Sequence, residues 1–241
     1  MRILVVSDIH ANHNALEAVI ADAGKVDAVW CLGDLVGYGP DPNESIELIR
    51  AQPNLTCLIG NHDAAVLDQV DMASFNHDAY LSVVWTRKNI TPANKEFLAS
   101  LPQRVEIGYV TLTHGSPRNP IWEYLLDLNT VVINFSFFKT SLCFVGHTHI
   151  PISYSYNGNG HVNWNVPQPG PAYKITEQTI LNPGSVGQPR DRDPRAAYAI
   201  FDSEERTWQA FRVVYDVTST QQRILDAELP RRHALRLGEG W

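Results

Sequence analysis

Residues 2–10 read RILVVSDIH, a short apolar and largely β-branched run that ends in polar side chains able to bind metals. Such a run predicts a buried β-strand over Ile3–Val6. Asp8 and His10 then fall where the strand gives way to a loop. Polar residues in this position are typical of a site at the carboxyl end of a strand in an α/β protein.

The alternation of strand and helix continues from this stretch along the chain. Further strands are predicted at 28–32, 56–59, 105–107, 109–113, 142–145, 152–156, 162–165, 179–181, 196–201 and 208–214, and helices at 14–23, 44–50, 74–101, 128–138 and 218–228. Ser74, Thr91 and Thr218 are the expected helix caps. The stretch 168–171 reads as a loop, and the basic segment 231–233 as a solvated end. This order predicts an α/β fold in which an antiparallel sheet follows the parallel one.

Composition limits the class of protein. The chain has 241 residues, of which 44% are hydrophobic and 19% charged, with a net charge of −7. No internal repeat or linker divides it, so we expect a single domain over residues 1–241. The acidic balance argues against a long nucleic acid as partner. Neither a membrane span nor a signal peptide is evident, so we expect a cytoplasmic protein without a membrane partner.

The three cysteines, Cys31, Cys57 and Cys143, lie in apolar stretches without close spacing. An odd count in this arrangement does not predict a disulfide framework. We interpret them as small buried hydrophobic residues of the strands.

Five short elements place candidate metal ligands at predicted strand ends. They are Asp8-Ile9-His10, Gly33-Asp34, Gly60-Asn61-His62-Asp63, Thr113-His114-Gly115 and Gly146-His147-Thr148-His149. The carboxyl ends of strands in an open α/β sheet face a common crevice, so we expect these elements to converge. Taken singly, Asp8 could instead cap the following helix, Asn61 and Asp63 could form turns, and the His147–His149 pair could be partly exposed polar residues.

The donor chemistry indicates which ions such a site would hold. Carboxylate, amide and imidazole groups suit Mn²⁺, Fe²⁺ or Zn²⁺ without a thiolate. Seven ligands exceed the needs of one four-coordinate zinc and suit two ions that share a carboxylate. Gly33, Gly60 and Gly146 stand at the turns out of the strands, where a positive φ or a close approach of the backbone to a bound anion is expected.

In this order the five elements resemble the calcineurin-like metallophosphoesterases, whose pattern is D-x-H, G-D, G-N-H-[DE], H and G-H-x-H. The resemblance covers residues 8 to 149 and implies a four-layer sandwich of two mixed β-sheets flanked by helices. It also implies two divalent metal ions (Mn, Fe, Zn, Ni or Co) and the roles of individual residues. Asp8, His10 and His149 would bind one metal, Asn61, His114 and His147 the other, and Asp34 would bridge both.

The resemblance further implies hydrolysis of a phosphoester by a hydroxide that bridges the two ions. His62 would protonate the leaving oxygen or stabilise the transition state, and Asp63 would orient His62. Phosphodiesters are the first expectation for the substrate, followed by phosphomonoesters and nucleotides. The alternatives are a nucleotide pyrophosphatase or nuclease, and a non-catalytic, metal-stabilised interaction module on the same fold.

The sequence departs from the family's phosphoprotein phosphatases after the bridging aspartate. Their G-D-x-V-D-R-G pattern is replaced by GDLVGYG over residues 33–39, which lacks the arginine. This absence argues against a protein phosphatase and weakens a relation to the diadenosine tetraphosphatases that resemble those enzymes. Ala11, in place of a glycine common after the first histidine, is expected to matter little. The pattern as a whole resembles the small prokaryotic phosphodiesterase-like members.

Other residues must then bind the substrate. Arg118 and Arg190 follow turn-rich loops near strand ends and are candidates, with structural ion pairs as the alternative. His13 near the first metal loop and Tyr38 in the rim formed by residues 37–42 are further candidates, against surface placement and loop packing. His77, His161 and His233 are expected to be ordinary surface residues. The oligomeric state does not follow from the sequence.

Overall fold

The computed structural model describes residues 1–158 and 161–241, whose strands form two sheets of six strands each. The first sheet has the order β3 (Thr56–Cys57), β2 (Ala28–Cys31), β1 (Arg2–Val6), β11 (Ala196–Asp202), β12 (Thr207–Val213) and β9 (Ala172–Lys174). The second has the order β4 (Arg104–Ile107), β5 (Val110–Thr113), β6 (Leu142–Phe144), β10 (Gln178–Asn182), β7 (Ile152–Tyr156) and β8 (Val162–Asn165). Both sheets mix parallel and antiparallel pairs.

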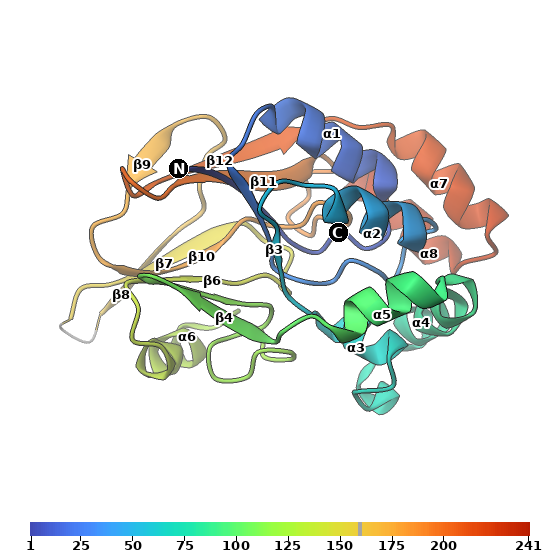
Figure 1. The fold of residues 1–241 in the computed structure, drawn as a ribbon, viewed down its shortest axis with the longest axis horizontal. Coiled ribbons are helices and arrows are strands. Elements are labelled where there is room, and N and C mark those ends of the chain that lie inside the picture. Colours follow the sequence, from blue (N-terminus) through green and yellow to red (C-terminus); the bar gives the residue numbers. More distant parts are fainter. Residues whose placement is uncertain (159–160) are drawn as a thin grey trace.

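Helices cover the outer faces of both sheets (Figure 1). They are α1 (His13–Ala23), α2 (Pro42–Arg50), α3 (Asn61–Val66), α4 (His77–Asn89), α5 (Pro92–Ala99), α6 (Leu128–Asn134), α7 (Val217–Asp226) and α8 (Arg231–Glu239), with short 3₁₀ turns at Met72–Ser74 and Phe135–Phe137. In Figure 1, α1 and α2 lie on the first sheet and α6 lies beneath the second. The expected four-layer sandwich is confirmed.

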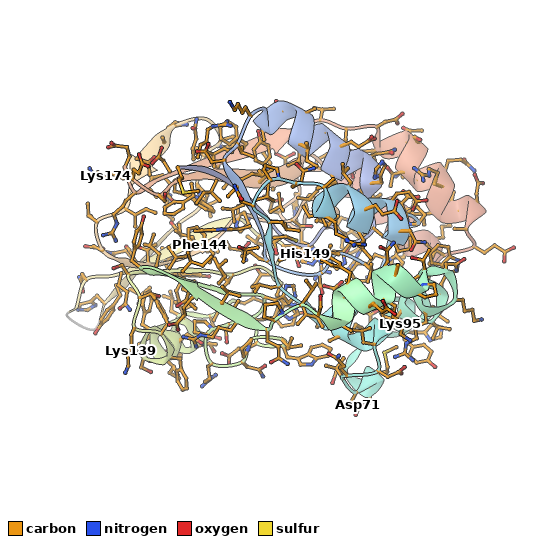
Figure 2. All side chains as sticks on the ribbon, in the orientation of Figure 1. Asp71, Lys95, Lys139, Phe144, His149 and Lys174 are labelled. Atoms are coloured by element: carbon orange, nitrogen blue, oxygen red, sulfur yellow. The ribbon has the colours of Figure 1, made fainter. Side chains whose placement is uncertain are left out.

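The alternation of side chains along β1 shows how the layers are held. Ile3 and Val5 belong to the core between the two sheets, whereas Leu4 and Val6 belong to the core beneath the helices. Phe144 of β6 also lies between the sheets, and Figure 2 shows it in the interior of the molecule. Because both faces of β1 are buried from its second residue on, the strand is apolar from Ile3 to Val6, as in other fully covered sheets.

The three cysteines are buried and free, as predicted. No described helix combines the length and the apolar character needed to cross a bilayer.

Several expected boundaries are wrong. The amide oxygen of Asn12 caps α1, so Asp8 does not do so. Asn76 caps α4 in place of Ser74, and Asp216 caps α7 in place of Thr218, while the cap at Thr91 is confirmed. Asn and Asp oxygens reach the free N–H groups of a first helical turn as well as hydroxyls do, so neighbouring candidates are hard to rank.

The end of the chain also differs from the expectation. Residues 231–239 form α8, which packs against α7, and the side chain of His233 is buried. The prediction of a solvated basic tail is therefore wrong. Strand β9, which follows the loop at 168–171, was not predicted either, because its three residues carry no alternation long enough to detect.

The parallel strands set the position of the site. Strands β1, β2 and β3 run parallel within the first sheet, and β5 and β6 run parallel within the second. The loops that leave their carboxyl ends carry all five sequence elements. Figure 2 shows His149, from the last of these elements, inside the molecule.

Candidate metal centre

The first group of candidate ligands consists of Asp8, His10 and His149, whose ligand atoms all lie within 4.8 Å of one another. His10 Nδ1 lies 3.1 Å from the carbonyl oxygen of Val36, and His149 Nδ1 lies 2.6 Å from that of Gln188. A carbonyl only accepts hydrogen bonds, so both rings must carry their proton on Nδ1. Their Nε2 atoms are then acceptors only.

These two Nε2 atoms face each other at 3.1 Å. Two lone pairs at this distance repel, and a cation beside both nitrogens relieves the repulsion, since burial disfavours a second proton on either ring. The nearer carboxylate oxygen, Asp8 Oδ1, lies 3.4 Å from His149 Nε2. The orientation of the imidazoles therefore fits a cation bound by these three side chains.

The second group consists of Asp34, His114 and His147, again within 4.8 Å of one another. His114 Nδ1 lies 2.9 Å from the carbonyl oxygen of Leu32, which directs Nε2 toward Asn61 Oδ1 at 3.1 Å. The donor set of one carboxylate, one amide oxygen and two imidazoles suits a divalent transition metal.

Asp34 lies between the two groups. Its Oδ2 is 3.6 Å from His10 Nε2 and 3.4 Å from His114 Nε2, so a single carboxylate oxygen faces ligands of both groups. Its other oxygen accepts a hydrogen bond from the His62 backbone N–H at 2.8 Å. This is the position expected of a bridging carboxylate. The seven ligand candidates thus converge, and every one is buried.

The backbone around the site is strained in a way that the sequence does not reveal. Asp8, His10, Asp34, His147 and His149 all have positive φ, between 49° and 65°. Residues other than glycine rarely adopt this region, and such outliers gather where function fixes the direction of a side chain.

The glycines beside these ligands make room for protein atoms. Gly33 has the expected positive φ of 99°. A Cβ on Gly60 would lie 2.1 Å from Asp34 Oδ1, and one on Gly146 would lie 1.9 Å from Ser7 Oγ. The close approach predicted at these two positions is present, but the neighbours are the ligand loops themselves.

Electrostatics divides the histidines into two kinds. Burial holds the pKa of His10, His147 and His149 well below its usual value, so these rings are neutral at pH 7. Burial acts in the same direction on His114, but the Asp34 carboxylate outweighs it and raises the pKa of His114 to about 9. Burial alone would raise the pKa of Asp34, but the combined effect of His114, His62 and His10 keeps the pKa of that carboxyl well below its usual range.

This difference predicts a pH dependence of metal binding. At pH 7 the metal-free protein holds a proton on His114, and a metal must displace it because only a neutral imidazole binds. We expect binding to release about one proton, and affinity to rise with pH until the pH passes the pKa of His114 at about 9. Titration calorimetry in two buffers of different protonation enthalpy measures this release. A binding heat that is independent of the buffer would contradict it.

His62 lies beside the two groups and is almost completely enclosed. Its ring centroid lies 4.9 Å from that of His10, 4.3 Å from that of Tyr38 and 5.0 Å from that of Phe75. Burial lowers the pKa of His62 to about 4. Its Nδ1 has no hydrogen-bond partner within residues 1–158 and 161–241.

Asp63, expected to orient His62, makes other contacts. Its carboxylate accepts hydrogen bonds from the backbone N–H groups of Gly60 and Val36, at 2.9 and 3.1 Å. No hydrogen bond to the His62 ring is found among the described residues. Asp63 therefore holds the start of α3 against the loop after β2, and any effect on His62 acts through the backbone.

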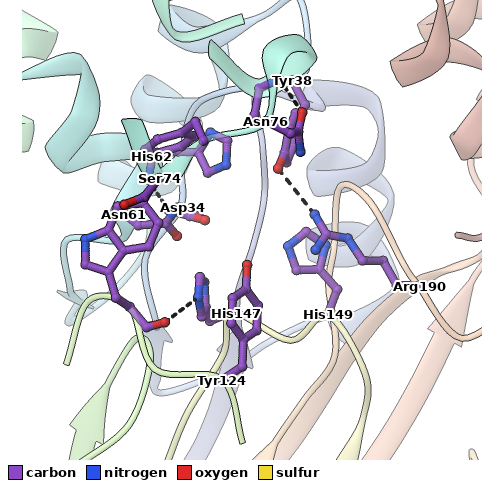
Figure 3. Close-up of a pocket in the computed structure, with 13 residues that line it drawn as sticks. Asp34, Tyr38, Asn61, His62, Ser74, Asn76, Tyr124, His147, His149 and Arg190 are labelled. Atoms are coloured by element: carbon purple, nitrogen blue, oxygen red, sulfur yellow. Dashed lines mark hydrogen bonds between the residues drawn. The ribbon is translucent and has the colours of Figure 1, made fainter. Parts of the chain in front are cut away.

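A pocket of about 50 Å³ opens over the ligands (Figure 3). Tyr38 and Arg190, two of the four candidates for substrate contact, line it. The guanidinium of Arg190 donates to the Tyr38 hydroxyl at 3.4 Å and to Gln188 Oε1 at 3.1 Å. Neither partner carries a negative charge, so the guanidinium charge faces the pocket without a carboxylate partner in the described part of the chain.

The other two candidates do not line this pocket. Arg118 is engaged by Glu123, whose carboxylate lies 3.0 Å from Arg118 Nε, so the alternative of a structural ion pair holds. His13 is the first residue of α1, and its Nε2 lies 3.4 Å from Glu17 Oε1. The expectation of substrate contact finds no support in the position of either side chain.

Several pocket residues were not predicted from the sequence. Phe75, Trp122 and Tyr124 form an aromatic wall, in which the Tyr124 ring stacks on His147 with centroids 3.8 Å apart. Trp122 contributes its carbonyl oxygen, 3.2 Å from His147 Nε2. For Trp122 and Tyr124 the available signal was their place in a loop that leads away from the predicted strand at 109–113, where functional residues gather. Phe75 fell inside the helical segment predicted at 74–101 and carried no such signal.

His233, expected on the surface, instead packs against this region. Its ring centroid lies 4.8 Å from that of Tyr38, and the side chain is only 2% exposed. The sequence signal that was missed is the spacing of Ala234 and Leu237, which gives the nine-residue helix α8 an apolar face.

Comparison with known proteins agrees with this geometry. The model of the calcineurin-like phosphoesterase superfamily domain matches residues 1–206. An uncharacterized protein of Methanocaldococcus jannaschii is 40% identical over 239 residues, which cover 95% of this chain and 93% of that protein.

Two solved structures are similar over the full length. A metallophosphoesterase from Sphaerobacter thermophilus is 43% identical, with a TM-score of 0.92, and covers 100% of this chain and 99% of its own. A hypothetical protein from Pyrococcus horikoshii, 20% identical with a TM-score of 0.81 over 100% and 98% of the two chains, shares the fold. With the ordered ligands and the two-sheet architecture, the family match shows that this chain belongs to the calcineurin-like phosphoesterase superfamily.

Proposed function

We propose that this protein is a metal-dependent phosphoesterase that hydrolyses phosphodiesters at two divalent metal ions. The observation that carries the proposal is the pair of ligand groups that meet at Asp34. The facing acceptor nitrogens of His10 and His149 support a cation on one side. Asn61, His114 and His147 provide a second donor set on the other side of the carboxylate.

The side chains have separate tasks in this proposal. Two bound metal ions would activate a water molecule and neutralise the charge that develops on the phosphoryl oxygens. His62 is placed to donate a proton or a hydrogen bond to the leaving oxygen, since it lines the pocket beside Asp34 and Asn61. Arg190 lines the same pocket and binds a phosphoryl oxygen through its unpaired guanidinium charge.

The pocket favours a small substrate. Its volume of about 50 Å³ is enough for a phosphoryl group, while the substituents of that group extend along the aromatic wall of Phe75, Trp122 and Tyr124. An aromatic surface next to an ester site suits an aryl or nucleoside substituent, which stacks on it. A small-molecule phosphodiester is therefore the proposed partner, with phosphomonoesters and nucleotides as the next classes.

A non-catalytic interaction module on the same fold is the competing proposal. Such a role does not require a complete set of ligands, a histidine beside them and an open pocket. All three features are present here, which supports the enzyme.

The test compares bis(p-nitrophenyl) phosphate with p-nitrophenyl phosphate. The protein is stripped with a chelator, reloaded with Mn²⁺ and assayed, then examined in the same way with Co²⁺, Ni²⁺ and Zn²⁺. We expect diester turnover that disappears on stripping and returns with metal. Faster turnover of the monoester would replace the proposed substrate class, and no turnover with any metal would favour the interaction module.

The same assay distinguishes a small substrate from a nucleic acid. Each phosphate contact of a polyanion releases counterions, so turnover of an oligonucleotide falls steeply with added salt. For a small diester in this acidic protein we expect a shallow dependence. A steep loss, together with preference for an oligonucleotide, would identify a nuclease.

A further inference from the structure

A second hollow lies next to the metal centre, between the start of α4 and α8. Its cavity volume is about 220 Å³, and it is lined by Asn76, His77, Asp78, Arg232, His233 and Arg236. Since a water molecule takes up about 30 Å³ in the liquid, there is room for a phosphoryl group. Helix α8 lies beyond residues 1–206, which the family model matches, so Arg232, His233 and Arg236 come from outside the matched range and the other three lining residues from inside it.

The hollow carries an uncompensated positive charge. Arg232 and Arg236 lie one helical turn apart on the same face of α8. The carboxylate ion pairs of the described residues engage other arginines, namely Arg87, Arg104, Arg118, Arg195, Arg212 and Arg223. Asp78 is the one carboxylate among the lining residues, opposite two guanidinium groups.

Contacts with an aromatic ring keep these mutually repelling cations close together. Burial, followed by the charges of Arg190 and Arg232, lowers the pKa of Arg236. The guanidinium carbons of Arg232 and Arg236 lie 5.6 and 5.4 Å from the Trp241 ring centroid, so one aromatic face positions both. Like charges held together in a protein of net charge −7 indicate an anion as their partner.

One buried donor of the hollow also lacks a partner. The Nε of Arg236 has no hydrogen-bond partner within the part of the chain that the structure describes. His233 is 2% exposed and donates from Nε2 to the Asp78 carbonyl oxygen at 3.1 Å, so its Nδ1 is an acceptor and adds no donor to the hollow. The first N–H groups of α4, beyond its Asn76 cap, add donors that the helix itself does not use.

The hollow borders the pocket over the ligands. Asn76 lines both, and Figure 3 shows it near Tyr38. The Tyr38 ring contacts His233 of the hollow and His62 of the pocket, with centroid distances of 4.8 and 4.3 Å. One extended molecule can therefore reach both places.

We propose that Arg232 and Arg236 bind a second phosphoryl group of the same substrate whose ester is hydrolysed at the metal centre. The substrate class is then a compound with two separated phosphoryl groups, one esterified and one terminal. This inference rests on the proposed phosphoesterase function for the first group and adds a specificity site for the second.

A binding experiment on the metal-loaded protein tests the site by affinity, since in this proposal the metal ions help to hold the first phosphoryl group. Calorimetry compares the α,ω-bisphosphates of linear alkanediols of increasing length with the monophosphates of the same diols, and inorganic phosphate serves as the free anion. We expect one length to bind at least about 10-fold more tightly than its monophosphate. The double variant Arg232→Gln/Arg236→Gln should lose that advantage, whereas Arg231→Gln, an exposed neighbour outside the hollow, should keep it.

A second experiment connects the hollow to turnover. The p-nitrophenyl esters of the best bisphosphate and of its monophosphate are compared as substrates of the metal-loaded protein. In the double variant, kcat/KM for the doubly charged ester should fall at least about 10-fold more than kcat/KM for the singly charged one.

The outcomes separate the two proposals. If bisphosphates bind more tightly than monophosphates but no ester is hydrolysed, the phosphoesterase proposal is refuted and the anion site is supported. Binding of inorganic phosphate with no advantage for any bisphosphate would show an independent anion site and overturn the inference. An advantage that survives in the double variant would overturn it as well.

Discussion

Replacement of Asp34 by asparagine is expected to weaken metal binding at both positions together, by at least about 100-fold at each. The Oδ2 atom of Asp34 is 3.6 Å from His10 Nε2 and 3.4 Å from His114 Nε2. The change therefore removes the single negative charge that the two ligand groups share. Asparagine tolerates the left-handed backbone better than most residues, so the φ of 54° at this position does not confound the result.

Metal content after dialysis and calorimetric titration measure the effect. The matched control is Asp41→Asn, because Asp41 is also a buried aspartate but pairs with Arg223 outside the ligand groups. The control should bind two metals like the unchanged protein. An Asp34→Asn protein that still holds two metals tightly and keeps full activity would show that the Asp34 carboxylate does not bridge. If only one metal is lost, Asp34 belongs to one ligand group alone.

The convergence of the candidate ligands could be predicted because each of them is marked locally in the sequence. Each ligand lies within a few residues of a strand whose apolar run is easy to detect, as at Asp8 after β1 and His114 after β5. The carboxyl ends of parallel strands lie at the same edge of a sheet, so the candidate ligands come together without any need to predict individual long-range contacts.

The backbone conformation of the ligands could not be predicted in the same way. Positive φ at His10, His147 and His149 is unfavourable for each residue alone, and only the surrounding fold stabilises it. Local propensity therefore argues against the observed geometry at the residues that matter most.

The walls of the pocket were beyond sequence reasoning for a different reason. Trp122 and Tyr124 come from an irregular loop. His233, which contacts the pocket residue Tyr38, comes from a helix more than one hundred residues further along the chain. No periodicity connects them. Arg118 and Arg190 illustrate the same limit, since both follow turn-rich loops, yet one is engaged by Glu123 and the other lines the pocket.

The second large effect is expected for His62→Ala, which should lower turnover about 10²–10⁴-fold while both metals remain bound. The loss should be greatest for esters with a poor leaving group, because they depend most on a proton or hydrogen bond given to the leaving oxygen. His161→Ala is the matched control, since His161 is an exposed histidine remote in sequence from every ligand loop.

Metal content decides between this role and a structural one. His62 also lies within 4.8 Å of His10 and Asp34 when their ligand atoms are compared, so it is placed to bind a cation itself. Loss of a metal in His62→Ala would assign it that role. Unchanged turnover of a poor leaving group, with both metals present, would remove it from the mechanism.

Gly37→Ala provides an independent test of the same ring. Gly37 has a φ of +88°, and an added Cβ would lie 2.3 Å from His62 Nδ1. The methyl group forces the imidazole or the backbone at residue 37 to move, because the two cannot keep this distance and alanine is strained at this φ. If the position of His62 and not merely its presence supports turnover, this variant should lose rate with both metals retained, as His62→Ala does. A Gly37→Ala protein with full turnover would show that the ring acts from more than one position, which a directed hydrogen bond to the leaving oxygen does not allow.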